Sequence, residues 1–112
     1  MGTLVSRKLG VLMKIVKIWL DDERPMPDSS WIPMKNSNVC ILLLKACKRR
    51  NIIPETISLD HDLGGDDTSR AVVLWMCEND FWPKTVYVHS MNPIGREWLI
   101  GMVDRYGPGV TR

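Results

Sequence analysis

The chain has 112 residues, enough for one domain with a hydrophobic core and too few for two. Its hydrophobic fraction of 45% and charged fraction of 25% are those of an ordinary globular protein, and no apolar run reaches the length of a membrane span. Of its 15 basic residues, Arg7 and Lys8 lie near the N-terminus, and the remaining 13 balance 13 acidic residues. This neutral balance argues against a protein that coats duplex DNA.

The N-terminal part of the chain divides into an extension and a first strand. Residues 1–12 show no clear periodicity, and we interpret them as an N-terminal extension to a single domain at 13–112. Residues 14–20 (KIVKIWL) are β-branched and apolar, a pattern that predicts a buried strand. Pro25 and Pro27 exclude a helix directly after this strand, so a loop is predicted there.

A short strand and a helix are predicted next. Residues 31–36 (WIPMKN) form the short strand, and Pro33 indicates an edge position because proline lacks a backbone donor. Residues 37–51 predict a helix with Ser37 as its N-cap. Basic residues near its end suit the negative pole of a helix dipole.

Two further strands flank a second helix. Residues 55–60 (ETISLD) and 84–90 (KTVYVHS) have the composition of buried strands. Between them, residues 67–80 predict a helix whose N-cap is Asp67 or Thr68.

A final helix is predicted at 94–107, ended by Gly107 and Pro108. Apolar strands that alternate with helices imply a parallel sheet covered on both faces. The predicted fold is therefore α/β, a three-layer sandwich with a short, mainly parallel sheet of about four strands covered by helices. Right-handed crossovers would place the C-terminal ends of the strands at the same rim.

The three cysteines indicate the redox environment in which the protein is found. Cys40, Cys47 and Cys77 lie in apolar stretches and fit no metal-binding spacing. An odd number of such residues predicts buried free thiols in a reducing environment, and hence a cytoplasmic location.

Polar residues collect where the three clearest strands end, in the segments DDERP, HDLGG and HSMNP. In an open parallel sheet these ends share one rim, which is where ligands bind. Convergence of residues so far apart in sequence is the strongest functional signal in the chain. The residues expected there are Asp21, Asp22, Glu23, Asp60, His61, Asp62, His89, Ser90 and Asn92.

Two chemistries are compatible with this set. Asp21, Asp22 and Asp60 could hold Mg²⁺ or Mn²⁺, which would offset their mutual repulsion and polarise a phosphoryl oxygen. His61 and His89, the two histidines of the chain, could instead act as an acid–base pair.

The remaining polar residues are candidates for holding the substrate. Carboxylates after a strand often organise turns or cap helices, which is the favoured role for Asp62, Asp66 and Asp67 taken singly. As part of the set, Asp62 is nonetheless a candidate substrate contact. An anion would be bound by guanidinium groups, by polar side chains and by the start of the final helix. The candidates are Arg24, Asp62, Ser90, Asn92 and Arg96.

Three motifs in order, WLDDERPMP, SLDHDLGG followed by VVLWM, and VHSMNPIGRE, resemble the receiver-like domains of the cyclic-phosphate processing family, over roughly residues 13–103. The resemblance implies a reduced response-regulator receiver fold and action on cyclic phosphate ends in RNA repair. It implies that Asp21 and Asp22 are the acidic pair that holds Mg²⁺, that Asp60 is the strand-end aspartate that receivers phosphorylate, and that Ser90 lies near the receiver hydroxyl position.

This sequence departs from receivers in two respects. The final strand with its lysine has no obvious counterpart, and histidines flank the site. Both departures favour phosphoester chemistry or nucleotide binding over phosphotransfer signalling.

The leading hypothesis is a phosphoesterase that opens a 2′,3′-cyclic RNA end or a cyclic nucleotide. One histidine would activate water and the other would protonate the leaving oxygen, with Asp60 and a metal ion at the reacting centre. Two alternatives remain open. The chain could bind a cyclic nucleotide or RNA end without cutting it, as a sponge or sensor, or Asp60 could accept a phosphoryl group.

Overall fold

The computed structural model describes residues 15–112, so the extension predicted at 1–12 lies outside the described residues. Its sheet has four parallel strands in the order β2-β1-β3-β4. The strands are β1 (Lys17–Leu20), β2 (Ile32–Met34), β3 (Thr56–Leu59) and β4 (Thr85–Val88). The helices are α2 (Ser37–Arg49), α3 (Arg70–Asn79) and α4 (Pro93–Tyr106). The predicted α/β class and four-stranded parallel sheet are confirmed.

The central strands carry the core of the protein. β3 lies between β1 and β4 and is buried at all four positions. Apolar side chains of neighbouring strands are in register, as with Ile18 beside Ile57 and Leu20 beside Leu59. Pro33 lies in β2 at the edge of the sheet, as predicted, so its missing N–H leaves no ladder bond unmade.

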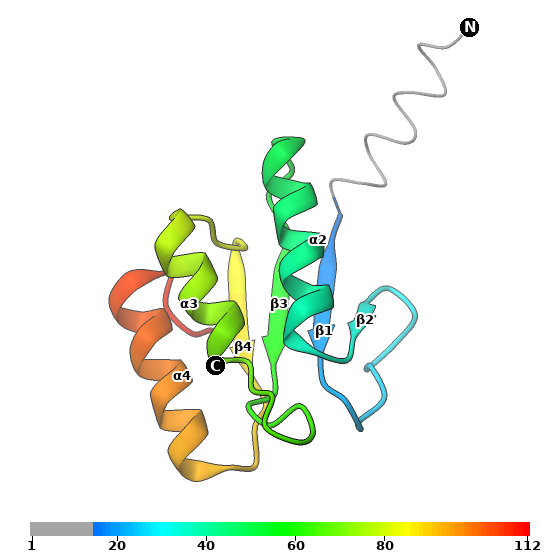
Figure 1. The fold of residues 1–112 in the computed structure, drawn as a ribbon. Coiled ribbons are helices and arrows are strands. Elements are labelled where there is room, and N and C mark those ends of the chain that lie inside the picture. The colour runs from blue at the N-terminus through cyan, green and yellow to red at the C-terminus, as the bar shows by residue number, and fades with distance from the viewer. Residues whose placement is uncertain (1–14) are drawn as a thin grey trace, which may run out of the picture.

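The three helices lie on one face of this sheet (Figure 1), with α2 against α3 and α3 against α4. Both crossovers, from β2 to β3 and from β3 to β4, run in the same direction across the sheet, so right-handed connections put their helices on the same side. Within residues 15–112 the opposite face of the sheet carries no helix, which differs from the predicted cover on both faces. Pro25 and Pro27 prevent a helix after β1, and the loop there brings Trp31 edge-on against Trp19 at 5.7 Å between ring centroids.

The hydrophobic core fills the space between the sheet and the helices. Cys40 and Cys47 are buried in it as free thiols, whereas Cys77 is only partly buried. Burial raises the pKa of Cys40 to about 12, so its thiol stays protonated and unreactive at neutral pH. The fully buried apolar side chains include Ile18, Leu20, Leu44, Ile57, Leu59, Val72, Val73, Met76, Val86, Leu99 and Val103.

The N-terminus of α2 differs from the prediction. Asn36, not Ser37, is the N-cap, and its side chain accepts a hydrogen bond from the backbone N–H of Val39 at 2.9 Å. Ser37 instead donates from its backbone nitrogen and its hydroxyl to the two carboxylate oxygens of Asp67, at 2.8 and 2.5 Å. Asp67 therefore ties the loop after β3 to α2. The N-cap of α3 is Ser69, which makes no side-chain capping bond.

We expect Asn36→Ala to lower the free energy of unfolding by about 1 kcal/mol, because the amide of Val39 loses its acceptor. Urea denaturation measures the change. Asn38→Ala is the matched control, since Asn38 is exposed in the same turn of α2 and alanine favours a helix interior. An equal loss of stability in both variants would show that the cap contributes nothing.

The C-terminal residues occupy the position beyond β4. Val110 forms a parallel bridge with Val86, and the backbone N–H of Thr111 donates to the carbonyl of Val86 at 2.8 Å. This short segment lies where a fifth strand would pair, and residues 107–112 contain no lysine. None of the helices in the described part of the chain is long and apolar enough to cross a membrane.

Candidate functional site

Three carboxylates meet at the C-terminal ends of β1 and β3. Asp21 and Asp22 follow β1, Asp60 follows β3, and one oxygen from each lies within 4.8 Å of the other two. The convergence of these three residues is as predicted. Carboxylate oxygens so grouped suit a divalent cation, because its charge would offset their repulsion. That a metal binds here stays a prediction.

Asp21 is the fixed member of the cluster. It is 2% exposed, and its Oδ1 accepts hydrogen bonds from the backbone N–H groups of Glu23 and Arg24, both at 2.8 Å. Its Oδ2 lies 2.9 Å from Nε2 of His89. Burial alone would raise the pKa of Asp21, but the bonds from Arg24, Glu23 and His89 together hold it below its usual value. Asp21 is therefore ionised and rigidly held.

Asp60 experiences the opposite balance. Its Oδ1 accepts a single bond from the backbone N–H of His61 at 2.9 Å. Burial, followed by the nearby charge of Asp21, raises the pKa of Asp60 above its usual value. The ionised form of Asp60 is therefore electrostatically destabilised, and a bound cation would offset part of this destabilisation.

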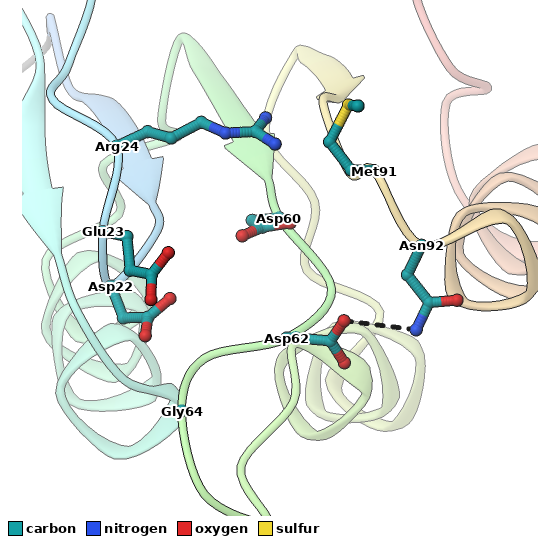
Figure 2. Close-up of a pocket in the computed structure, with 8 residues that line it drawn as sticks. All are labelled: Asp22, Glu23, Arg24, Asp60, Asp62, Gly64, Met91 and Asn92. Carbon is teal, nitrogen blue, oxygen red and sulfur yellow. Dashed lines mark hydrogen bonds between the residues drawn. The ribbon is translucent and has the colours of Figure 1, made fainter.

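Two members of the cluster, Asp22 and Asp60, line a pocket of about 280 Å³ (Figure 2), and Asp21 lies behind them. Arg24 lies over the pocket, with Nη1 donating to the backbone carbonyl of His89 at 2.8 Å, and its other donors are available to a ligand. Gly64 has φ +91°, and a Cβ there would lie 3.1 Å from Oδ2 of Asp22, so glycine lets this loop approach the cluster. The lining residues are Asp22, Glu23, Arg24, Asp60, Asp62, Gly64, Met91 and Asn92.

The charge of this pocket is strongly acidic. Four of its lining side chains are carboxylates and one is a guanidinium. The negative potential of these carboxylates would repel a phosphate unless a cation accompanied it. The pocket therefore suits a metal–phosphate combination better than a free anion.

His89 lies on the face of the sheet opposite α2, α3 and α4. Its ring stacks on Trp19, with centroids 4.0 Å apart and an interplanar angle of 6°. Nδ1 is 2.7 Å from Oγ of Ser58 and Nε2 is 2.9 Å from Asp21. Burial lowers the pKa of His89 although Asp21 opposes the shift, so the ring is neutral at pH 7. The tautomer that satisfies both contacts donates from Nε2 to Asp21 and accepts at Nδ1.

His61 lies on the other side of the sheet, under the start of α4. It is 5% exposed, and its Nε2 accepts from Nε of Arg70 at 2.9 Å. The ring proton is therefore on Nδ1, which donates to Oδ1 of Asp62 at 2.9 Å. Arg70 in turn lies 4.8 Å from the ring centroid of Trp98, so its guanidinium is held between His61 and α4.

The remaining predicted residues divide between the pocket and its supports. Asn92 donates to Asp62 at 3.2 Å (Figure 2) and caps α4 by accepting from the N–H of Gly95 at 3.1 Å. Ser90 is buried, and its hydroxyl accepts from the backbone of Asn92. Arg96 donates to the carbonyl of Val88 at 3.1 Å. Ser90 and Arg96 do not line the pocket, and neither do the histidines. The catalytic and binding roles of all these residues stay predictions.

Sequence reasoning missed the residues that hold His89. Neither Ser58 nor Trp19 was among the residues expected at the rim. Strand alternation carries the signal, because Trp19 precedes Asp21 by two residues and Ser58 precedes Asp60 by two, which puts each pair on one face.

The strand order, the acidic pair after β1 and the aspartate after β3 together define a receiver-like domain. Comparison with protein families identifies it further. The model of the cyclic-phosphate processing receiver domain matches residues 16–105, and the chain belongs to this family, as the sequence motifs indicated. No curated protein and no solved structure gives a significant match.

Proposed function

We propose that this protein is a phosphoesterase that opens cyclic phosphates at the acidic pocket. The substrate is a 2′,3′-cyclic RNA end or a cyclic nucleotide. Hydrolysis adds one water across a ring P–O bond and leaves a phosphomonoester and a free hydroxyl. The observation that carries the proposal is the cluster of Asp21, Asp22 and Asp60 opposite Arg24, in a chain whose family is named for processing cyclic phosphates.

The carboxylates and Arg24 would hold the phosphate by two different contacts. Asp21, Asp22 and Asp60 are the residues that would hold Mg²⁺ or Mn²⁺, which when bound supplies positive charge opposite the phosphoryl oxygens. Arg24 donates to those oxygens from the other wall of the pocket and favours the geometry in which charge develops on them. Both contacts are needed, because the pocket without a cation repels the substrate.

The histidines act in this proposal as positioning residues. His89 fixes Oδ2 of Asp21, and His61 fixes Oδ1 of Asp62, which also contacts Asn92. Each ring nitrogen already has a protein partner, so this role agrees better with the geometry than the predicted acid–base pair does. A pocket carboxylate outside the three-carboxylate cluster, Glu23 or Asp62, then accepts the proton of the attacking water and passes it to the ring oxygen that leaves.

Turnover is tested directly with a panel of substrates. The purified protein is incubated with uridine 2′,3′-cyclic phosphate, an oligonucleotide ending in a 2′,3′-cyclic phosphate, and 3′,5′-cyclic mono- and dinucleotides. Mg²⁺, Mn²⁺ and EDTA are compared, and products are read by chromatography and mass. We expect a linear phosphomonoester with metal and none with EDTA. Product formation at equal rates in EDTA would contradict the metal-dependent reaction.

The same assay separates the two roles of the histidines. As a positioning residue, His89→Ala raises the metal concentration needed for half-maximal turnover and keeps most of the rate at saturating metal. Complete loss at saturating metal would instead support the acid–base pair. Wild-type behaviour of both His89→Ala and His61→Ala would contradict either role.

Binding without cleavage is the second candidate. It is favoured by the same engagement of both imidazoles, which leaves no free ring nitrogen in the described residues to protonate a leaving oxygen. Intact ligand recovered in complex with the protein after long incubation with metal would support it. Transfer of a phosphoryl group to Asp60 is less favoured, because residues 107–112 beside β4 contain no lysine.

A further inference from the structure

A second hollow adjoins the acidic pocket. Asp22, Glu23 and Arg24 line both cavities, so the two meet along this short segment. The second cavity has a volume of about 320 Å³, similar to that of the first. Its remaining lining residues are Trp19, Asp21, Pro25, Met26, Pro33 and Lys35.

The walls of this hollow differ in chemistry from the acidic pocket. Beyond the shared segment they are formed mainly by the indole of Trp19, two prolines and the partly buried Met26. The indole Nε1 already donates to the backbone carbonyl of Arg24 at 3.0 Å, so Trp19 presents no unsatisfied donor to a ligand. The exposed ammonium of Lys35 adds a donor at the wall. The hollow therefore suits a flat apolar group with polar edges.

Arg24 links the two cavities through different atoms. Its guanidinium lies over the acidic pocket (Figure 2), while its carbonyl accepts from the indole that lines the second hollow. A ligand that placed a phosphate beneath the guanidinium could extend directly along the other side of this residue. One ribose ring is the natural spacer between a cyclic phosphate and a base.

We propose that this hollow is a nucleobase subsite, which holds the base attached to the cyclic phosphate. The inference rests on the proposed function and adds to it the surface that recognises the base. A base would lie between the apolar walls and direct its polar edge toward Lys35 or solvent. A wholly apolar occupant would use only the second hollow, whereas a nucleotide would place its phosphate, with a cation, in the acidic pocket and its base in the hollow.

The loop that forms the subsite is tied down without a ligand. Nζ of Lys17 donates to Oγ of Ser30 at 2.8 Å and lies 4.6 Å from the ring centroid of Trp31. Asp28 accepts from the backbone of Ser30 at 2.8 Å. These contacts hold the far part of the loop, at residues 28–31. The segment that lines the hollow is held by the bonds from the N–H groups of Glu23 and Arg24 to Asp21, so binding a base costs little ordering there.

The test compares two ligands that differ only in the base. Uridine 2′,3′-cyclic phosphate and 1-O-methyl-ribose 2′,3′-cyclic phosphate are assayed with the full chain in Mg²⁺, by kcat/KM where product forms and by calorimetric Kd where it does not. We expect the nucleotide to be favoured about tenfold, the scale of one base–aromatic contact.

Two variants at adjacent loop residues test whether the base binds in this hollow. Met26→Ser should lower the preference for the nucleotide about threefold or more and leave the methyl riboside unchanged. Pro27→Ser is the control, since Pro27 is the next residue and does not line the hollow.

Each outcome separates this inference from the proposed function. Equal use of both ligands would overturn the nucleobase subsite and leave the phosphoesterase or binding function standing. A tenfold preference that Met26→Ser does not reduce would place the base elsewhere and likewise overturn the subsite. Neither binding nor turnover of either ligand would overturn the proposed function itself, and the subsite with it.

Discussion

Asp60→Asn should make the protein more stable than wild type in EDTA and less stable than wild type in Mg²⁺. In EDTA, ionised Asp60 opposes folding, because burial and the charge of Asp21 raise its pKa. Asparagine keeps the acceptor for the backbone N–H of His61 and removes the charge. After discounting for solvent screening, we expect a gain of about 0.5 kcal/mol at neutral pH, measured by urea denaturation.

The pH dependence of this difference has a defined sign. The usual pKa of Asp60 is 3.8 and the folded value lies above it. Below 3.8 the carboxyl is protonated in both states and does not oppose folding, so the two proteins should converge. The advantage of Asp60→Asn should then appear as the pH rises through the raised folded pKa. Asp21 has a lowered pKa, so its stabilising contribution is present above 3.8 and is lost as the pH falls.

Mg²⁺ should reverse the ranking if the cluster binds it. At 100 times the Kd, the ion stabilises wild type by about 2.7 kcal/mol. Loss of one charged ligand weakens binding by about 100-fold, so the variant gains only about 0.4 kcal/mol at that concentration. Turnover should fall by about the same 100-fold factor when Mg²⁺ is far below the Kd of both proteins.

Asp66→Asn is the matched control for these measurements. Asp66 is an exposed acid in the same loop and is not part of the three-carboxylate cluster. It should respond to Mg²⁺ and EDTA as wild type does. If Mg²⁺ stabilises Asp60→Asn as strongly as wild type, the ion does not bind at Asp60.

The sheet was predictable because its strands are short apolar runs with clear breaks. β3 is buried at every position, and the edge position of β2 follows from Pro33. The meeting of Asp21, Asp22 and Asp60 follows in turn, since parallel strands end at one rim. The local sequence pattern and the sheet topology are therefore sufficient to predict the three-carboxylate cluster.

The roles of the two histidines could not be predicted from their positions at the strand ends alone. Extending strand alternation past β3 puts His61 on the helical face with Leu59, and extending it past β4 puts His89 on the opposite face with Tyr87. One partner of each ring, however, comes from a distant part of the chain. Arg70 reaches His61 from the start of α3, and Asp21 reaches His89 from the loop after β1.

The N-cap of α2 depended on a tertiary contact, whereas the helix-free face of the sheet in residues 15–112 followed from the loop between β1 and β2. Asn36 and Ser37 are both good capping residues, and the choice is made by Asp67, which is 30 residues away in sequence and engages Ser37. Helices on one face result from the absence of a helix between β1 and β2. Pro25 and Pro27 in that loop exclude the helix that would have covered the second face between β1 and β2.

Gly95→Ala is expected to lower the free energy of unfolding by about 2–3 kcal/mol, measured by urea denaturation. A Cβ at this position would lie 2.3 Å from Cγ of His61 and 2.5 Å from its Cδ2. The ring cannot simply move away, because it is buried and its nitrogens are held by Asp62 and Arg70. Displacing it would also release Asp62 from its place in the acidic pocket.

Gly101→Ala is the matched control within α4. Nothing lies within 4 Å of a Cβ at Gly101, so alanine should stabilise the helix by about 0.5–1 kcal/mol. Introducing Gly95→Ala into a His61→Ala background tests the cause. Without the imidazole the clash is gone, and Gly95→Ala should become neutral or stabilising there. An equal loss in both backgrounds would mean that contact with His61 is not what requires glycine at residue 95.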